Sequence, residues 1–281
     1  MMPAVPRLAF RVAAFVAVVA SAADARAFCR TTTEHAPVGY DPANAGCWTP
    51  GVPLAWGGGQ HVSYALGSSA SKHISLADAT RIARLAFDAW NHASCGGGPP
   101  SVQTFAATPV DDSVVAGDCG LNACDPTIHD PNHLIVFRDN GWPHNDPTNT
   151  LALTTVTYGV QSGTIYDADM EINSTEQNHV ISAQEPPPSG TYDLQGIMTH
   201  EAGHFLGLAH ATDKRSIMYA LYQPGALDLT ADDISGVCAI YPPQSAGCSC
   251  STVAAGSRPW LAGAASALVA VGWARRRRRR R

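Results

Sequence analysis

The chain has 281 residues, of which 45% are hydrophobic and 15% are charged, and its formal net charge is −5. Its basic residues gather at the two ends, because residues 28–250 hold seven Lys and Arg against twenty-two Asp and Glu. An acidic body without a basic stripe argues against nucleic-acid binding. With both ends interpreted as processing signals, about 215 residues remain, enough for one domain with a sizeable core.

Residues 1–27 have the composition of a secretory signal peptide. Arg7 and Arg11 precede the apolar run "VAAFVAVVASAA", which is too short to span a membrane as a helix, and the small-residue site "ARA" ends at Ala27. We expect cleavage before Phe28 and export of the mature chain. Residues 28–52 then form an N-terminal segment, too short for a prodomain with a core of its own.

The body of the chain contains six cysteines, namely Cys29, Cys47, Cys95, Cys119, Cys124 and Cys238. An even number in an exported chain predicts disulfides, and six cysteines allow fifteen pairings. In one of these pairings, Cys119 and Cys124 close a local loop, Cys29 and Cys47 form a bridge within the N-terminal segment, and Cys95 is bonded to Cys238. The rival interpretation, a cysteine zinc site, is weakened because the body has no CxxC pair.

Residues 53–243 are predicted to form one α/β domain. A helix is expected from Ser75, because Ser75 and Asp78 form a capping box and apolar residues follow at helical spacing up to Trp90. Four short stretches rich in β-branched or aromatic residues predict strands: "SVQTFA", "HLIVF", "ALTTVTY" and "TIYDADMEI". Residues 108–132, rich in Asp, Pro and Cys, are interpreted as a surface insertion.

Two more helices follow. One is expected to start near Asp193, after the breaker run "EPPPSG", and the last is capped by Thr230 and Asp233 and ended by "PP" at residues 242–243. We see no internal repeats.

The strand "TIYDADMEI" carries an acidic face. Asp167, Asp169 and Glu171 alternate along it, so their side chains project from one side of the strand. Such an oxygen-rich surface suits a Ca²⁺ ion. A solvated acidic strand face is the equally weighted alternative.

The stretch "MTHEAGHFLGLAH" contains the candidate metal-binding and catalytic residues. His200 and His204 are four residues apart, so on a helix they project from one face, with Glu201 beside them to hold a metal-bound water. Gly207 tolerates the left-handed conformation that ends a helix and lets the chain return with His210. Three histidines and an open fourth position predict a catalytic zinc site. The alternative is a chance match, or histidines that only form hydrogen bonds within a core. The motif fixes five positions, which argues against this alternative.

The residues "HEAGHFLGLAH" and, shortly after, "SIMYALY" with Met218 resemble the catalytic core of the metzincin metallopeptidases, most closely the matrixin branch. The strand "PLAWGGGQHVSYAL", the helix "ADATRIARLAFDAWNHAS" and the closing helix "LTADDISGVCAIYPP" extend the resemblance over about residues 53–242. It implies a metzincin catalytic domain of α/β (α+β) type, with a mixed twisted sheet, an active-site helix, a methionine turn and a C-terminal helix. It also implies one catalytic Zn²⁺, Glu201 as general base, protein or peptide substrates, and a monomer.

The chain departs from the matrixin pattern at several positions. Ala211 and Ala220 replace the usual serine and proline. His144 and Asp146 fit the first pair of the family's second zinc site, but Leu153 and Asp169 stand where histidines are expected. The sequence therefore does not support a second zinc site.

The C-terminal end has three parts: a linker at residues 244–258, an apolar segment at residues 259–274 and an Arg-rich tail at residues 275–281. The order of a Gly-Cys-x-Cys motif with Cys248, an apolar helix and an arginine cluster is similar to the sorting signals of myxobacterial surface proteins. It implies membrane or cell-surface association, with Cys248 as the processing site. Retention as a transmembrane anchor stays open.

Two hypotheses for function result. The first is an exported zinc endopeptidase, anchored at the cell surface or released from it. The second is a non-enzymatic adhesion or binding module on a zinc-stabilised metzincin scaffold. An intact Glu201 and an open zinc position favour the first. Cys29 and Asp41 are candidates to cover the zinc in a latent form, against their ordinary roles in a disulfide and in a turn.

Overall fold

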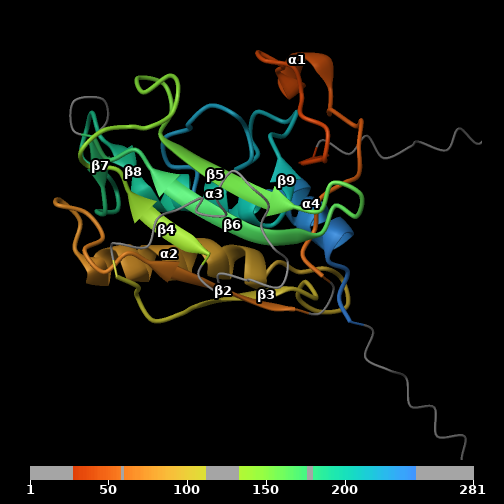
Figure 1. Cartoon of the computed structure of the whole chain (residues 1–281), viewed down its shortest axis with the longest axis horizontal. Helices are drawn as coiled ribbons and strands as arrows, with labels where there is room; N and C mark the ends of the chain where they lie inside the picture. The colour runs from red at the N-terminus through yellow and green to blue at the C-terminus, as the bar shows by residue number, and fades with distance from the viewer. Residues whose placement is uncertain (1–27, 58–59, 112–132, 176–179, 245–281) are drawn as a thin grey trace, which may run out of the picture. The chain divides into compact units, whose positions relative to one another are not determined.

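A computed structural model describes residues 28–57, 60–111, 133–175 and 180–244 of the chain (Figure 1). Its elements follow in the order β1 (Cys29–Arg30), α1 (Pro42–Ala45), β2 (His61–Leu66), α2 (Leu76–Asn91), β3 (Gln103–Ala106), β4 (Leu134–Phe137), β5 (Ala152–Tyr158), β6 (Ile165–Ile172), β7 (Ile181–Ser182), β8 (Tyr192–Asp193), α3 (Leu194–Phe205), β9 (Leu208–Ala209) and α4 (Ala231–Ile240). All four predicted strands and all three predicted helices are present.

Five strands form the main sheet in the order β3-β2-β4-β6-β5. Neighbours from β3 to β6 run parallel, whereas β5 pairs with β6 in the antiparallel direction. The mixed sheet with helices confirms the predicted α/β fold class. β5 lies at the edge of this sheet, so one side of its backbone keeps N–H and C=O groups that can pair with another extended chain.

The two long helices pack on each other and on the sheet. The side chain of Ser75 caps α2, as predicted, by accepting a hydrogen bond from the Asp78 amide. The indole of Trp90 on α2 donates to the Thr199 carbonyl on α3 at 2.9 Å. In Figure 1 α2 runs beside β2 and β3, and α3 lies behind β5 and β6. The main core fills the space between these elements and buries large aromatic side chains.

The N-terminal segment pairs with the domain at β9, the short strand that follows α3. β1 pairs antiparallel with β9, with Cys29 opposite Ala209. The disulfide Cys29–Cys47 closes this segment, and Cys95–Cys238 joins the region after α2 to α4. Both bridges were among the predicted pairings. The third predicted pair, Cys119 with Cys124, lies outside the described residues.

The predicted processing segments also lie outside the described residues. These are the signal peptide at residues 1–27, Cys248, the apolar segment at residues 259–274 and the Arg-rich tail, so their roles stay predictions. Within the described ranges, no helix combines the length and the apolar character that a membrane span requires.

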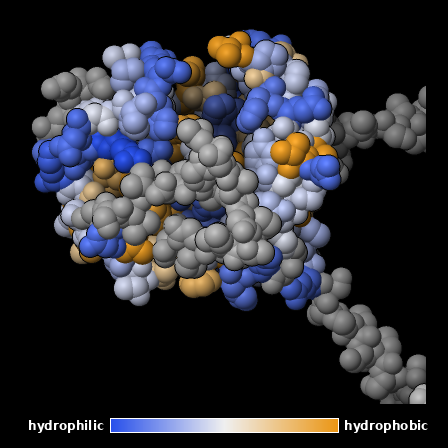
Figure 2. Space-filling view, in the orientation of Figure 1, coloured by the Kyte–Doolittle hydropathy of each residue, from blue (hydrophilic) through white to orange (hydrophobic). Residues whose placement is uncertain are grey.

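Figure 2 shows the described surface in the same orientation as a mosaic in which hydrophilic residues predominate and hydrophobic ones stand in small separate groups. The large hydrophobic side chains that are exposed come from scattered places in the sequence, for example Val38, Phe105 and Val160. Isolated exposed apolar residues are normal on a folded domain and indicate no binding face by themselves.

Candidate metal centre

Helix α3 and the turn after it bring three histidines together. His200 and His204 lie one turn apart on α3, and His210 follows β9. One ligand atom from each ring can be chosen so that all three lie within 4.8 Å of one another, and this is the only such group among the described residues. The convergence predicted from the spacing is therefore present in the fold.

Gly207 makes the return of the chain possible. Its φ of +89° lies in the left-handed region, and a Cβ at this position would approach the Leu54 carbonyl oxygen to 2.7 Å. A residue with a side chain would be strained here and would also collide with the backbone. The turn predicted at Gly207 thus depends on glycine for two separate reasons.

The hydrogen bonds of the rings leave lone pairs for a cation. Nδ1 of His200 donates to the Ile217 carbonyl at 2.7 Å, and Nδ1 of His204 donates to the Leu208 carbonyl at 2.8 Å. In neutral rings both Nε2 atoms then carry lone pairs, and these two atoms lie only 3.1 Å apart. Two facing lone pairs repel each other unless a cation binds between them. The donor set therefore fits a zinc ion.

Two of the three rings, those of His200 and His210, are also held in the neutral form that a metal requires. Burial, assisted by the charge of His204, lowers the pKa of His200 to about 3. Burial, with smaller contributions from His204 and His200, lowers the pKa of His210 to about 2. Neutral imidazole is the metal-binding form, so the site favours coordination over protonation.

Glu201 lies beside the triad and is buried, with 6% of its surface exposed. Burial is the main cause that raises the pKa of its carboxyl above the ordinary value, while His204 and Thr154 act in the opposite direction. The Thr154 hydroxyl on β5 donates to Oε2 of Glu201 at 2.7 Å. A carboxyl with a raised pKa next to a metal site is suited to take up and release a proton.

Met218 lies in the turn that packs against this helix, and it is buried. A Cβ on Gly203, the residue before His204, would collide with the Met218 sulfur and approach Cζ2 of Trp90 to 2.8 Å. The absence of a side chain at Gly203 therefore lets the methionine turn approach α3 closely. This position agrees with the methionine turn that the resemblance implies.

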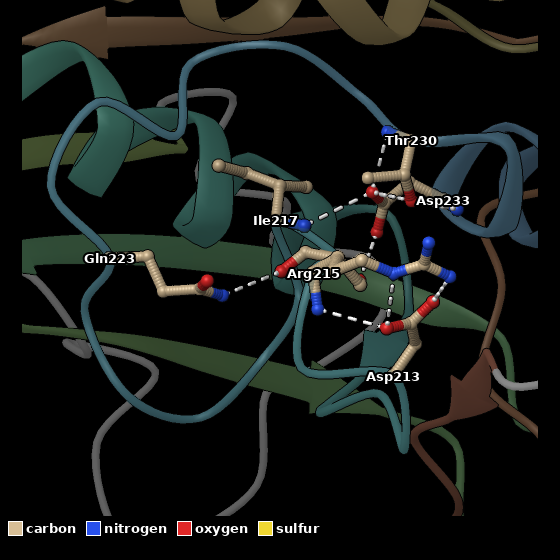
Figure 3. Close-up of polar contacts among 7 residues, drawn as sticks. Asp213, Arg215, Ile217, Gln223, Thr230 and Asp233 are labelled. Atoms are coloured by element: carbon tan, nitrogen blue, oxygen red, sulfur yellow. Dashed lines mark hydrogen bonds and ion pairs between the residues drawn. The ribbon is translucent and has the colours of Figure 1, made fainter.

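Asp233 at the start of α4 holds the methionine turn from behind (Figure 3). Its carboxylate accepts hydrogen bonds from the amide of Ile217 at 3.0 Å and from the amide of Thr230 at 2.8 Å. It also accepts hydrogen bonds from the hydroxyls of Ser216 and Thr230. Because Ile217 also supplies the carbonyl for His200, Asp233 is connected through one residue to the metal centre.

A cleft of about 870 Å³ opens over the triad. It is lined by β5, by α3, by residues that follow Met218, and by Thr31 and His35 of the N-terminal segment. Among these described lining residues Glu201 is the only acidic one, and none is Lys or Arg. The cleft therefore presents backbone, hydroxyl and apolar groups to a ligand.

Sequence reasoning missed two contributors to this site. Thr31 donates from its hydroxyl to the Leu208 carbonyl at 2.9 Å, and that carbonyl is also the acceptor for His204. Thr154 was seen only as part of a strand. No motif marks either threonine, because their contacts join residues 177 and 47 positions apart.

Neither candidate for covering the zinc does so. Cys29 is in a disulfide with Cys47, and Asp41 caps α1 by accepting from the amide of Ala43. Both residues have the ordinary roles that were named as alternatives.

The acidic face of β6 is engaged by protein groups. Asp167 pairs with Nδ1 of His133 at 2.7 Å, Asp169 accepts from the Leu134 amide at 2.8 Å, and Glu171 pairs with Arg138 and His144. All three carboxylates are buried, so the alternative of a solvated acidic face is wrong. The proposed Ca²⁺ site gains no support, since both oxygens of Glu171 and one oxygen each of Asp167 and Asp169 already have protein partners.

Comparison with known proteins agrees with this geometry. Residues 135–242 match the family model described as Matrixin. "Probable matrix metalloproteinase 095L" of Invertebrate iridescent virus 3 is 33% identical over 115 residues, which are 38% of this chain and 27% of the relative. "Metalloendoproteinase 1-MMP" of Arabidopsis thaliana is 43% identical over 54 residues, 18% of this chain and 15% of the relative.

"Interstitial collagenase" of Bos taurus is 49% identical over 54 residues, 19% of this chain and 12% of the relative. The chain thus spans about a quarter or less of the length of these relatives. The matched residues include most of β4, all of β5 and β6, the three histidines, Glu201 and the methionine turn. This part of the chain is therefore similar to a matrixin domain, the resemblance that its sequence also carries.

Proposed function

We propose that this protein is an exported zinc-dependent endopeptidase that hydrolyses peptide bonds in proteins. The observation that carries the proposal is the meeting of three histidines with a buried glutamate in an open cleft. His200, His204 and His210 would hold the ion through one ring nitrogen each. Among the described residues that line the cleft, Glu201 is the only acidic one, so it is the candidate for proton transfer.

Zinc, when bound, supplies a Lewis acid that polarises a peptide carbonyl and lowers the pKa of water towards neutrality. Glu201 accepts the proton of the attacking water and delivers it to the nitrogen of the leaving amine. Its raised pKa supports both steps, because burial makes the Glu201 carboxyl a stronger proton acceptor than an ordinary exposed carboxylate.

The substrate would bind as an extended strand antiparallel to β5, around Leu151 to Val156. The free backbone edge of β5 supplies hydrogen bonds that any peptide can make, whatever its sequence. Specificity would come from the pocket beyond Met218, where Leu221, Tyr222 and Ala226 line the cleft. These residues suit an apolar side chain on the carboxyl side of the cleaved bond.

The signal peptide and the two disulfides support export into an oxidising compartment. The C-terminal segment with Cys248 supports attachment to the cell surface or release after processing. Within this proposal the protein acts as a monomer on protein substrates, and zinc is its one catalytic cofactor.

The test is to produce the chain from Phe28 in an oxidising compartment and to measure cleavage of unfolded casein together with zinc content. Wild type is compared with Glu201→Gln, which keeps the size of the side chain. We expect one zinc in both proteins and cleavage only by the wild type. Zinc without cleavage in either protein would favour the binding module instead, and cleavage by Glu201→Gln would refute the assignment of the base.

A further inference from the structure

The carboxylate of Glu201 is held by one residue of the edge strand. Thr154 is the only residue among those described that forms a hydrogen bond with the Glu201 side chain, through its hydroxyl and Oε2 at 2.7 Å. The same hydroxyl lies 3.3 Å from the Glu201 backbone carbonyl. The base is thus fixed from the strand and not from its own helix.

This contact matters because Glu201 is buried, and among the described residues Thr154 is the one hydrogen-bond partner of its carboxylate. A glutamate has three rotatable side-chain bonds, and its last torsion is broad, so its two oxygens exchange places easily without a fixed partner. One hydrogen bond to Oε2 removes this freedom. It leaves Oε1 as the oxygen that is free to accept a proton.

The position of Thr154 also connects peptide docking with the base. Thr154 lies within β5, opposite Met170 of β6, and it lines the cleft. A peptide that pairs with the backbone of β5 would order the strand on which the Thr154 hydroxyl is mounted. The hydroxyl and the docking edge therefore belong to one element.

We propose that Thr154 is a positioning residue for Glu201, whose hydroxyl fixes Oε2 so that Oε1 takes the proton during peptide hydrolysis. This inference rests on the proposed endopeptidase function. A positioned general base contributes about 10²- to 10⁴-fold to a rate, and Thr154 would supply a part of that contribution. We expect a loss of about tenfold in kcat when the hydroxyl is removed, with binding unaffected.

The experiment compares Thr154→Val, which keeps the shape and loses the hydroxyl, with Thr154→Ser, which keeps the hydroxyl. Thr157→Val is the matched control, because Thr157 lies on the same strand but does not line the cleft. For each zinc-loaded protein we would measure kcat and KM on one short peptide, affinity for an uncleavable analogue of that peptide, zinc content and the unfolding midpoint.

The expected result is a kcat about tenfold lower in Thr154→Val, with KM and analogue affinity within twofold of wild type. Thr154→Ser should recover most of the rate, and Thr157→Val should match wild type. An unchanged kcat in Thr154→Val, or a raised KM with unchanged kcat, would overturn the inference while the function stands. A wild type that holds zinc and cleaves nothing would overturn both. If Thr154→Val loses zinc or unfolds, Thr154→Ala removes the same hydroxyl and decides the question.

Discussion

Removing the carboxylate of Asp233 should damage the metal centre from a distance. Asp233 is 1% exposed. Its carboxylate oxygens accept hydrogen bonds from the backbone amides of Ile217 and Thr230 and from two hydroxyls (Figure 3). In Asp233→Ala the hydroxyls of Ser216 and Thr230 can turn to other acceptors, but the two amides lose their acceptor. The damage is therefore set by the buried N–H of Ile217 and the partly buried N–H of Thr230.

A buried donor without an acceptor costs about 1–3 kcal/mol, and the partly buried Thr230 amide costs no more than that, so the two together cost at most about 6 kcal/mol. We expect Asp233→Ala to lower the free energy of unfolding by about 4 kcal/mol. Asp233→Asn keeps one oxygen for both amides and loses only the charge of the acceptor, so we expect about 1–2 kcal/mol. Because Ile217 orients His200, zinc affinity should fall by about 10- to 100-fold in Asp233→Ala.

The first assay is urea unfolding with the disulfides intact, monitored by tryptophan fluorescence, to which the buried Trp56 and Trp90 contribute. The second is zinc affinity, measured by competition with a chelator. Asp213→Asn is the control in the same loop, because its pair with the exposed Arg215 lies at the surface and should contribute little. A loss below 1 kcal/mol in Asp233→Ala, or equal losses in the Ala and Asn variants, would refute the reasoning from orphaned amides.

Three further predictions concern the same region. Gly203→Ala should destabilise the domain by about 1–3 kcal/mol in urea unfolding despite the better helix propensity of alanine, whereas Gly97→Ala, which meets only an ordinary contact, should not. In the metal-free protein the unfolding midpoint should fall as the pH drops below 6.5. The pKa values of His200 and His210 are lowered in the folded state, so at this pH the unfolded state binds protons that the folded state does not. A flat midpoint between pH 7 and pH 5 would contradict this. Thr31→Val should weaken zinc binding by about threefold to tenfold in chelator competition, because the Leu208 carbonyl loses one of its two donors; unchanged affinity would show that the N-terminal segment does not support the site.

Much of the site could be predicted from the sequence because its determinants are local. The spacing of His200, His204 and His210 follows from helix geometry and from the one residue, Gly207, that allows the chain to reverse. Capping residues and apolar periodicity likewise set the limits of α2, α3 and α4, since each depends on neighbours within a few positions.

Only the tertiary structure could decide how distant segments complete the site. The partners of Asp167, Asp169 and Glu171 come from other strands and loops, so an acidic face that the sequence offers to solvent or Ca²⁺ is buried against donors and cations. Thr31 and Thr154 reach the site across long sequence separations, where no period or motif can mark them. The sequence by itself determines which residues carry the chemistry, because their spacing is local, and the packing of strand on helix determines which ordinary residues hold them in place.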